Sequence, residues 1–527
     1  MSAALCAPRA AHAFCGFYVS GSNDQMFNDA TNVVLMRDGT RTVLSMQNNY
    51  KGPPEAFALV IPVPVVLHEP DVKTLPKDVF THVDQMGAPR LVEYWEQDPC
   101  RPPMPVEPMV MAAPAGAAEE KYEAASPKDL GVKIEAKFTV GEYQILILSA
   151  KDSTGLETWL TMNKYQIPPG AEPLLRPYVE AGMKFFVAKV DPTKIAFDKD
   201  GRVALSPLRF HYDSEEFALP IRLGLANSSG TQDLIVNILA PHQRYEVSNY
   251  PNVMIPTNLD LTPDMKSKFA GFYTALFDKV VQKHPGAVIT EYAWQAMTCD
   301  PCPGPTLQPG EFATLGADVL EGTSDKPTAY TGYDLVLTRL HARYGKDVTD
   351  DLRFKAAEPI VGGREFLGTD GQLEQGAKSD STNNFQGRYA IRHEWTGPIA
   401  CEHPTRHVWG GPWATEAASY SGPQSVTNVA FAPRGAVALG TAVVKDIPEL
   451  GVKAGAANAV AAPTTAGGTT PTASPVPDKT PAIAEKKKSG CGCQASGAGE
   501  GGAGAALFLG AVGLGLRRRR PRGGAAR

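Results

Sequence analysis

Short apolar runs separated by turn-forming residues dominate the chain. Residues 33–36 and 42–46 are two such runs, and they flank Asp38 and Gly39. An Asp-Gly pair between β-prone runs is a strong signal for a tight hairpin. A second hairpin, turning at Gly141, is predicted at 132–139 and 143–148, and single strands are predicted at 183–190, 203–212, 219–225, 232–239, 287–295 and 388–395.

The apolar run at 57–66 is interrupted by Pro62 and Pro64. Proline cannot donate a ladder hydrogen bond, so the run is predicted to form an edge strand or an irregular strand.

Helical periodicity is rare. The best helix is predicted at 264–284, where an apolar stripe is followed by Pro285 and Gly286. The stripe consists of Met265, Phe269, Phe272, Leu276 and Val280. Thr154 and Glu157 resemble a capping box that opens a shorter helix, and 333–344 is predicted to form another.

These patterns predict an α+β, β-rich fold with antiparallel, sandwich-like sheets and a few helices, followed by a disordered stalk and a short C-terminal apolar helix. The expected segments are a truncated signal peptide at 1–13, a β-rich region at 14–100, a Pro/Ala-rich insertion at 101–129, the main region at 130–445, a low-complexity linker at 446–489 and a sorting tail at 490–527.

The N-terminus carries a small-x-small pattern that ends at Ala13, so Phe14 would begin the mature chain. The preceding stretch lacks a positive start and a full apolar core. Either the true start lies upstream of Met1 or the pattern is accidental, and the C-terminal tail favours the first interpretation.

The C-terminal tail has three parts in order. Residues 454–489 form a spacer rich in Ala, Thr, Pro, Gly and Ser, which cannot bury enough apolar surface to fold. Cys491 and Cys493 follow it, and a short apolar stretch then ends in four arginines at 517–520. The uncharged run at 501–516 is too short and too Gly-rich for a secure membrane span, which needs about 20 apolar residues.

This tail resembles the myxobacterial sorting signal MYXO-CTERM. The resemblance implies that a sorting protease removes the tail and that Cys491 or Cys493 then carries lipid. It also implies an exported protein on the cell surface, at the outer membrane of a Gram-negative, myxobacterium-like bacterium. A plain C-terminal membrane anchor is the alternative.

The charge balance argues against nucleic-acid binding. The net charge is -5, but residues 494–527 contain six Arg and one Glu. The remaining chain has 45 Lys and Arg against 55 Asp and Glu, and so acidic a body repels phosphate backbones.

Several motifs in the body resemble the uncharacterised bacterial family called domain of unknown function 2330, over roughly residues 14–360. They are Phe14-Cys15-Gly16-Phe17-Tyr18, the run from Phe57 to Pro64, the run from Phe185 to Pro192, the run from Leu205 to Phe210, and the run from Leu337 to Tyr344. The resemblance supports an exported protein and implies no activity and no catalytic residues.

Five cysteines fall in the body, and in an exported chain they are first interpreted as disulfide candidates. They are Cys15, Cys100, Cys299, Cys302 and Cys401. No cofactor is predicted. A redox role for the Cys299-x-x-Cys302 pair is disfavoured by the Pro-Gly-Pro that follows it, and zinc on that pair with Cys401, His403 and His407 is a weaker alternative.

Aromatic and histidine side chains gather in a Gly/Pro-rich stretch. They are Trp395, Trp409 and Trp413 with Tyr389, His393, His403 and His407. Exposed aromatics of this kind could stack on a glycan or a protein ligand, or they could cap a β core.

Neither a GxSxG elbow, a GxxxxGK[ST] loop nor an HExxH motif occurs. We therefore expect a lipid-tethered structural or ligand-binding surface protein, whose partners are the envelope membrane, the sorting protease and a glycan or protein ligand. The alternative is a surface hydrolase or metal-dependent enzyme whose site is assembled only by folding.

Overall fold

The computed structural model describes residues 17–20, 30–47, 49–51, 57–100, 132–163, 165, 167–168, 170–195, 202–227, 230–320, 330, 332–365, 373–429 and 434–455. All of them belong to one compact unit, Met1–Pro463. Among the helices of these residues, none is both long and apolar enough to cross a bilayer. The expectations for the signal peptide, Cys15, the insertion, the spacer beyond position 455 and the sorting tail with its apolar helix lie outside the described residues.

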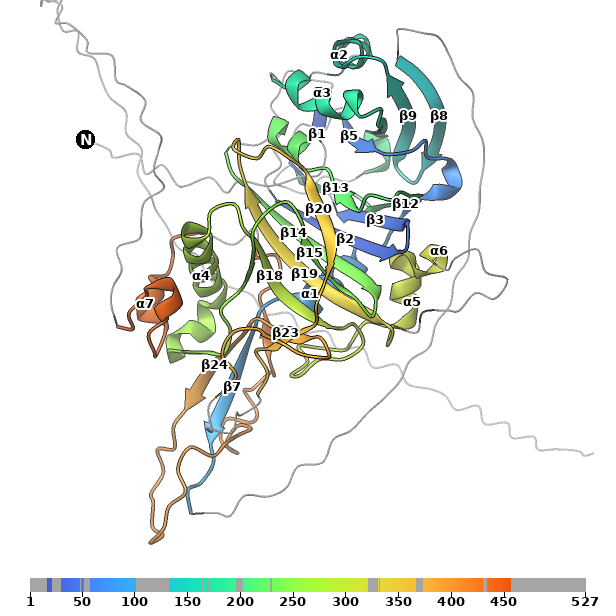
Figure 1. The fold of residues 1–527 in the computed structure, drawn as a ribbon. Coiled ribbons are helices and arrows are strands. Elements are labelled where there is room, and N and C mark those ends of the chain that lie inside the picture. Colours follow the sequence, from blue (N-terminus) through green and yellow to red (C-terminus); the bar gives the residue numbers. More distant parts are fainter. Residues whose placement is uncertain are drawn as a thin grey trace, which may run out of the picture. The chain divides into compact units, whose positions relative to one another are not determined.

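A large mixed sheet forms the centre of the unit, and Figure 1 shows β14, β19 and β18 running side by side within it. Its path is β22 (Lys378–Ser379), β21 (Ile360–Gly362), β23 (Asn384–Gln386), β18 (Val288–Gln295), β19 (Leu335–Tyr344), β14 (Gln232–Pro241), β2 (Ala30–Asp38), β3 (Arg41–Gln47), β12 (Leu208–Asp213) and β6 (Val72–Thr74), with β16 (Asn252–Met254) beside β18. Segments from both sides of the predicted 101–129 insertion thus share one sheet.

A second, antiparallel sheet is ordered β1 (Phe17–Ser20), β5 (Phe57–Val63), β10 (Lys184–Val190), β9 (Tyr143–Ala150) and β8 (Val132–Val140). Both hairpins are confirmed, since Gly39 and Gly141 adopt the positive φ that these turns require. The edge assignment of 57–66 is wrong, because β5 lies between β1 and β10. Pro62 is tolerated there because β1 pairs only with Phe57–Val60.

The two sheets pack face to face around one apolar core, which confirms the sandwich-like, β-rich α+β class. Leu35, Leu44 and Val236 of the central sheet meet Leu59 and Phe186 of the second sheet in this core. Two smaller sheets are formed by β4 (Asn49–Lys51) with β11 (Arg202–Ala204), and by β20 (Leu352–Ala357) between β13 (Ala218–Leu219) and β15 (Arg244–Val247).

Helices cover the outer faces of both sheets. The described α-helices are α1 (Asp78–Gly87), α2 (Ser153–Met162), α3 (Glu172–Glu180), α4 (Phe269–Lys283), α5 (Pro309–Phe312), α6 (Asp318–Leu320) and α7 (Leu439–Ala442), with a π-turn at Ala313–Ala317. The 3-10 turns are Glu69–Asp71, Pro192–Lys194, Arg222–Asn227, Pro263–Ser267 and Pro448–Leu450. Helices α2 and α3 cover the second sheet, whereas α1 and α4 cover the central one.

The apolar stripe predicted at 264–284 is fully buried, but the helix is divided. A 3-10 turn at Pro263–Ser267 precedes α4, and the break is at Lys268, whose backbone is not helical. The capping box is also corrected, because Asp152 caps α2 by accepting a hydrogen bond from the Gly155 N–H.

Two further predictions are wrong. The helix predicted at 333–344 is instead strand β19 (Leu335–Tyr344), and 219–225 is mostly a 3-10 turn rather than a strand. The packed chain also continues beyond position 445, because Ile447, Leu450 and Val452 are buried beside α4.

Candidate functional site

An extension leads away from the central sheet along β7 (Arg90–Glu96) and β24 (Arg388–His393) (Figure 1), which belong to a small five-stranded sheet. Its other strands are β25 (Trp409–Gly410) and β26 (Gln424–Ser425), with β17 (Leu259–Leu261) on the outer side of β24. Strands β7 and β24 are parallel, and β25 and β26 run antiparallel to β7. Residues 394–423 therefore form a long excursion fastened at both ends to β7.

Aromatic and charged side chains alternate across the two faces of the extension. On one face, Trp95 stacks on His393 with ring centroids 4.7 Å apart. On the other face, the Arg392 guanidinium lies 5.4 Å from the centroid of Tyr94 and 5.0 Å from that of Trp409. The two Arg392 contacts are cation–π interactions.

Glu96 is the main polar anchor of the excursion, and its side chain is fully buried. It accepts two hydrogen bonds from Arg406, at 2.7 and 2.9 Å, and two more from the backbone N–H groups of Trp395 and His407. The Arg406 hydrogen bonds, aided by the two N–H groups, lower the pKa of Glu96 to about 2. The carboxylate therefore stays ionised and holds both arms of the loop.

A disulfide adds a covalent fastening beside this anchor. Cys100 and Cys401 are joined across 301 positions of sequence, with Cα atoms 5.5 Å apart. The Thr405 N–H donates to the Pro99 carbonyl at 2.9 Å, and the Gln97 N–H donates to the Val408 carbonyl at 2.7 Å. The start of the excursion is thus tied to the end of β7 by covalent, ionic and backbone contacts.

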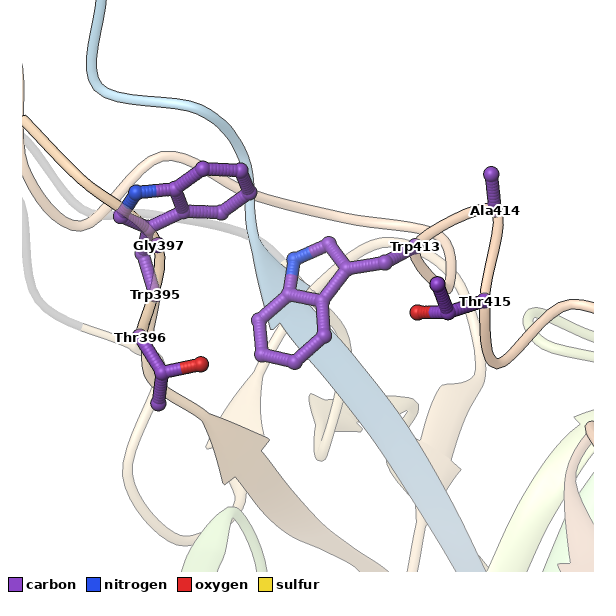
Figure 2. Close-up of a pocket in the computed structure, with 6 residues that line it drawn as sticks. All are labelled: Trp395, Thr396, Gly397, Trp413, Ala414 and Thr415. Atoms are coloured by element: carbon purple, nitrogen blue, oxygen red, sulfur yellow. The ribbon is translucent and has the colours of Figure 1, made fainter.

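The anchored loop presents a shallow hollow of about 260 Å³ on its surface. Figure 2 shows its two indoles, which come from separate segments of the excursion. The rings of Trp395 and Trp413 are 5.9 Å apart and nearly perpendicular, at 87°. The hollow is lined by Trp395, Thr396, Gly397, Trp413, Ala414 and Thr415.

The chemistry of the hollow is that of a contact surface rather than a reactive centre. Neither indole N–H is free for a ligand, because Trp413 donates to the Glu96 carbonyl at 2.8 Å and Trp395 donates to the Pro398 carbonyl at 3.4 Å. None of the six lining residues has a titratable side chain. Two aromatic faces and two threonine hydroxyls remain, and these suit stacking with few hydrogen bonds.

The structure divides the aromatic cluster that the sequence suggested. Tyr389 is buried in the core, 5.0 Å from Phe272, so it caps the sheet instead of facing a ligand. Trp409 stands under Arg392 and does not line the hollow. His403 and His407 are exposed on the excursion.

The weak zinc candidates are not brought together as one set. Cys299 and Cys302 are joined to each other, and Cys401 is joined to Cys100. Disulfide sulfurs are not the thiolates that zinc requires. In the part of the chain that the structure describes, no group of three His, Cys, Asp or Glu side chains could hold a metal ion.

A buried ionic network under α1 and α4 was not foreseen. Arg339 donates to Asp84 at 2.5 Å and to Glu291 at 2.6 Å, and His341 Nδ1 lies 2.7 Å from the second oxygen of Glu291. Arg343 pairs with Asp233 at 2.7 Å. The period-2 spacing of Arg339, His341 and Arg343 was the available signal, because it places them on one face of a strand.

Glu291 is central to this network and lies at an irregularity of β18. The register with β19 shifts between Thr290 and Tyr292, and such bulges redirect a side chain. Burial raises the pKa of Glu291, but His341 and Arg339 outweigh it and bring the pKa to about 2. Glu291, Arg339 and His341 are at most 2 % exposed, so the network stabilises the fold and is not open to a substrate.

The network predicts a stability maximum at mildly acidic pH. Burial lowers the pKa of His341, but Glu291 and Asp233 raise it more, so the net pKa exceeds the ordinary 6.5. His341 therefore adds stability below about pH 6.5, which is lost as pH rises through its folded-state pKa. Glu291 adds stability above its ordinary pKa of 4.5, which is lost as pH falls toward 2.

Thermal unfolding of the full chain across pH checks this expectation. The contribution of the network should be highest between about pH 4.5 and about pH 6.5, and His341→Gln should weaken the decline on the alkaline side. An alkaline decline that is identical in wild type and His341→Gln would contradict the assignment.

Together, the fold and the hollow define a strand-rich α+β protein that carries an aromatic contact surface on an anchored extension. The chain belongs to the family described as uncharacterized protein conserved in bacteria (DUF2330), whose model matches residues 9–355. No curated protein and no solved structure matches the chain. The family match includes β7, Cys100 and the buried network but ends before β24 and the hollow.

Proposed function

We propose that this protein is an exported, lipid-tethered, non-enzymatic surface protein that binds a ligand in the Trp395–Trp413 hollow. The observation that carries the proposal is the perpendicular indole pair on a loop fixed by Glu96 and by the Cys100–Cys401 disulfide. Aromatic rings held in place at low entropic cost are typical of binding surfaces. A loop needed only to connect β24 to β26 would not require three kinds of fastening.

Export and tethering rest on the two ends of the chain. The small-x-small pattern before Phe14 supports secretion, and the tail around Cys491 and Cys493 supports sorting and lipidation. A single acyl chain binds membranes only marginally, so more than one is expected on the mature protein. Surface biotinylation of intact cells should label the wild-type chain, and Cys491→Ser/Cys493→Ser should release it. Retention of that variant would contradict the tether.

The binding role is tested with the full chain on a glycan array and on an array of 15-residue peptides. We expect Trp395→Ala to lose at least about tenfold in signal on one of them, since a buried aromatic contact contributes roughly 1–3 kcal/mol. Trp409→Ala removes an indole from the same extension outside the hollow and should keep the signal. Signals that do not depend on Trp395, or no signal on either array, would contradict the proposal.

The enzyme alternative has less support from the described residues. The carboxylates of Glu291, Asp233 and Asp84 are each at most 3 % exposed and are paired with arginine or histidine. The accessible hollow contains no acid, base or nucleophile beyond threonine hydroxyls. Binding without chemistry is therefore the function that the geometry supports best.

A further inference from the structure

We propose that the Trp395–Trp413 hollow accepts a proline-rich segment in the polyproline II conformation, and that its resident occupant is the chain's own segment 102–108. This inference rests on the proposed binding function of the hollow and names the class of its ligand. Four observations support it: the polarity of the hollow, the geometry of its two rings, the spacing of prolines after Cys100, and the position of Cys100 relative to the hollow.

The polarity of the hollow favours a proline-rich peptide over a sugar. A sugar ring presents several hydroxyl groups, each of which needs a hydrogen-bond partner once water is removed. The hollow offers only the side-chain hydroxyls of Thr396 and Thr415, and Figure 2 shows both turned toward the Trp413 ring. A polyproline II segment presents pyrrolidine rings for the indole faces and carbonyl oxygens for the two hydroxyls.

The ring geometry fits the same class. Two nearly perpendicular indoles 5.9 Å apart form a corner with one wall from each ring. Aromatic-lined grooves bind PxxP segments because that helix is already extended and loses little entropy on binding. The ligand therefore needs apolar rings at regular spacing and few donors.

The chain contains such a segment directly after Cys100. Residues 102–108 read Pro-Pro-Met-Pro-Val-Glu-Pro, which places a PxxP spacing at Pro102 and Pro105 and a second at Pro105 and Pro108. Proline restricts φ to the polyproline region, so this sequence favours the required conformation before binding.

The position of Cys100 places this segment within reach. The Trp395 N–H and the Trp413 indole N–H both donate to Glu96, four positions before Cys100. The four residues from Glu96 to Cys100 span at most about 14 Å. The proline-rich segment begins two residues after Cys100, and in the polyproline II conformation it extends by roughly 3.1 Å per residue. A short connection of this kind gives an effective concentration in the millimolar range.

A peptide titration tests the proposal. The probe is a synthetic peptide of residues 101–114, titrated into the full chain and into the variant Pro102→Ser/Pro103→Ser/Pro105→Ser/Pro108→Ser. We expect the peptide to bind the variant roughly tenfold more tightly than wild type, because the resident segment no longer competes. The matched control makes the same four changes in the spacer, Pro471→Ser/Pro475→Ser/Pro477→Ser/Pro481→Ser, and should bind like wild type.

Adding Trp395→Ala to the 102–108 variant should abolish peptide binding, whereas adding Trp409→Ala should preserve it. Circular dichroism and an intact Cys100–Cys401 disulfide show that each variant is folded.

Three outcomes would overturn the inference. Equal affinity for wild type and the 102–108 variant would show that the hollow is not occupied by this segment. If segment 102–108 stopped competing with the peptide when the wild-type protein is diluted, the segment in the hollow would belong to a second copy of the chain. No binding to any variant would exclude proline-rich ligands, while a Trp395-dependent glycan signal on the arrays would leave the proposed binding function standing.

Discussion

Replacing Glu291 by glutamine is expected to lower the free energy of unfolding by about 3–5 kcal/mol, because it removes the buried negative charge that Arg339 and His341 share. Glu291 accepts from Arg339 at 2.6 Å and lies 2.7 Å from His341 Nδ1, and the Tyr273 hydroxyl donates to it at 2.5 Å. Glutamine keeps the size of the side chain, so the loss is electrostatic. Urea unfolding of the full chain, followed by circular dichroism, measures it.

Glu216→Gln is the matched control for this change. Glu216 pairs with Arg353 at 3.2 Å, but the two side chains are 60 % and 52 % exposed. An exposed pair contributes about 0–1 kcal/mol, so the urea midpoint should barely move. A Glu291→Gln loss as small as that of Glu216→Gln would contradict an electrostatic contribution of the buried network to stability.

Cys100→Ser/Cys401→Ser is expected to remove about 2–5 kcal/mol from the stability of the oxidised protein. The bond closes a loop of 301 positions, and constraining so long a loop in the unfolded chain is a large entropic effect. Urea midpoints under non-reducing conditions measure the loss. Trp395 and Trp413 should also become more accessible to an external quencher, because the excursion loses its covalent fastening.

Cys299→Ser/Cys302→Ser provides the control for the disulfide. These cysteines are only three positions apart, so their bond constrains little unfolded chain and should contribute less than about 2 kcal/mol. Equal losses for the two pairs would contradict loop closure as the source of stability.

Local patterns were sufficient where the determining contacts are local. The hairpins depend on Gly39 and Gly141, which the turns require at positive φ. The stripe from Met265 to Val280 predicted the buried face of α4. Strand β19 was missed because Arg339, His341 and Arg343 are polar on a face that is buried. Their partners Glu291 and Asp84 lie 48 and 255 positions from Arg339, so no local pattern reveals them.

The candidate site was predicted in part for the same reason. The sequence identified the tryptophans, but not that Trp395 and Trp413 form one hollow while Tyr389 enters the core. The role of Glu96 could not be predicted from the sequence, because its hydrogen-bond donors Trp395, Arg406 and His407 lie about 300 positions further along the chain.

The most direct test of the hollow as a binding surface is fluorine NMR of the full chain labelled with 5-fluorotryptophan. The chain has six tryptophans, whose resonances can be assigned by single substitutions. The variant Pro102→Ser/Pro103→Ser/Pro105→Ser/Pro108→Ser should shift the resonances of Trp395 and Trp413, and added peptide 101–114 should restore them. The resonance of Trp409 should stay in place. Unchanged Trp395 and Trp413 resonances in that variant, with or without peptide, would contradict the account.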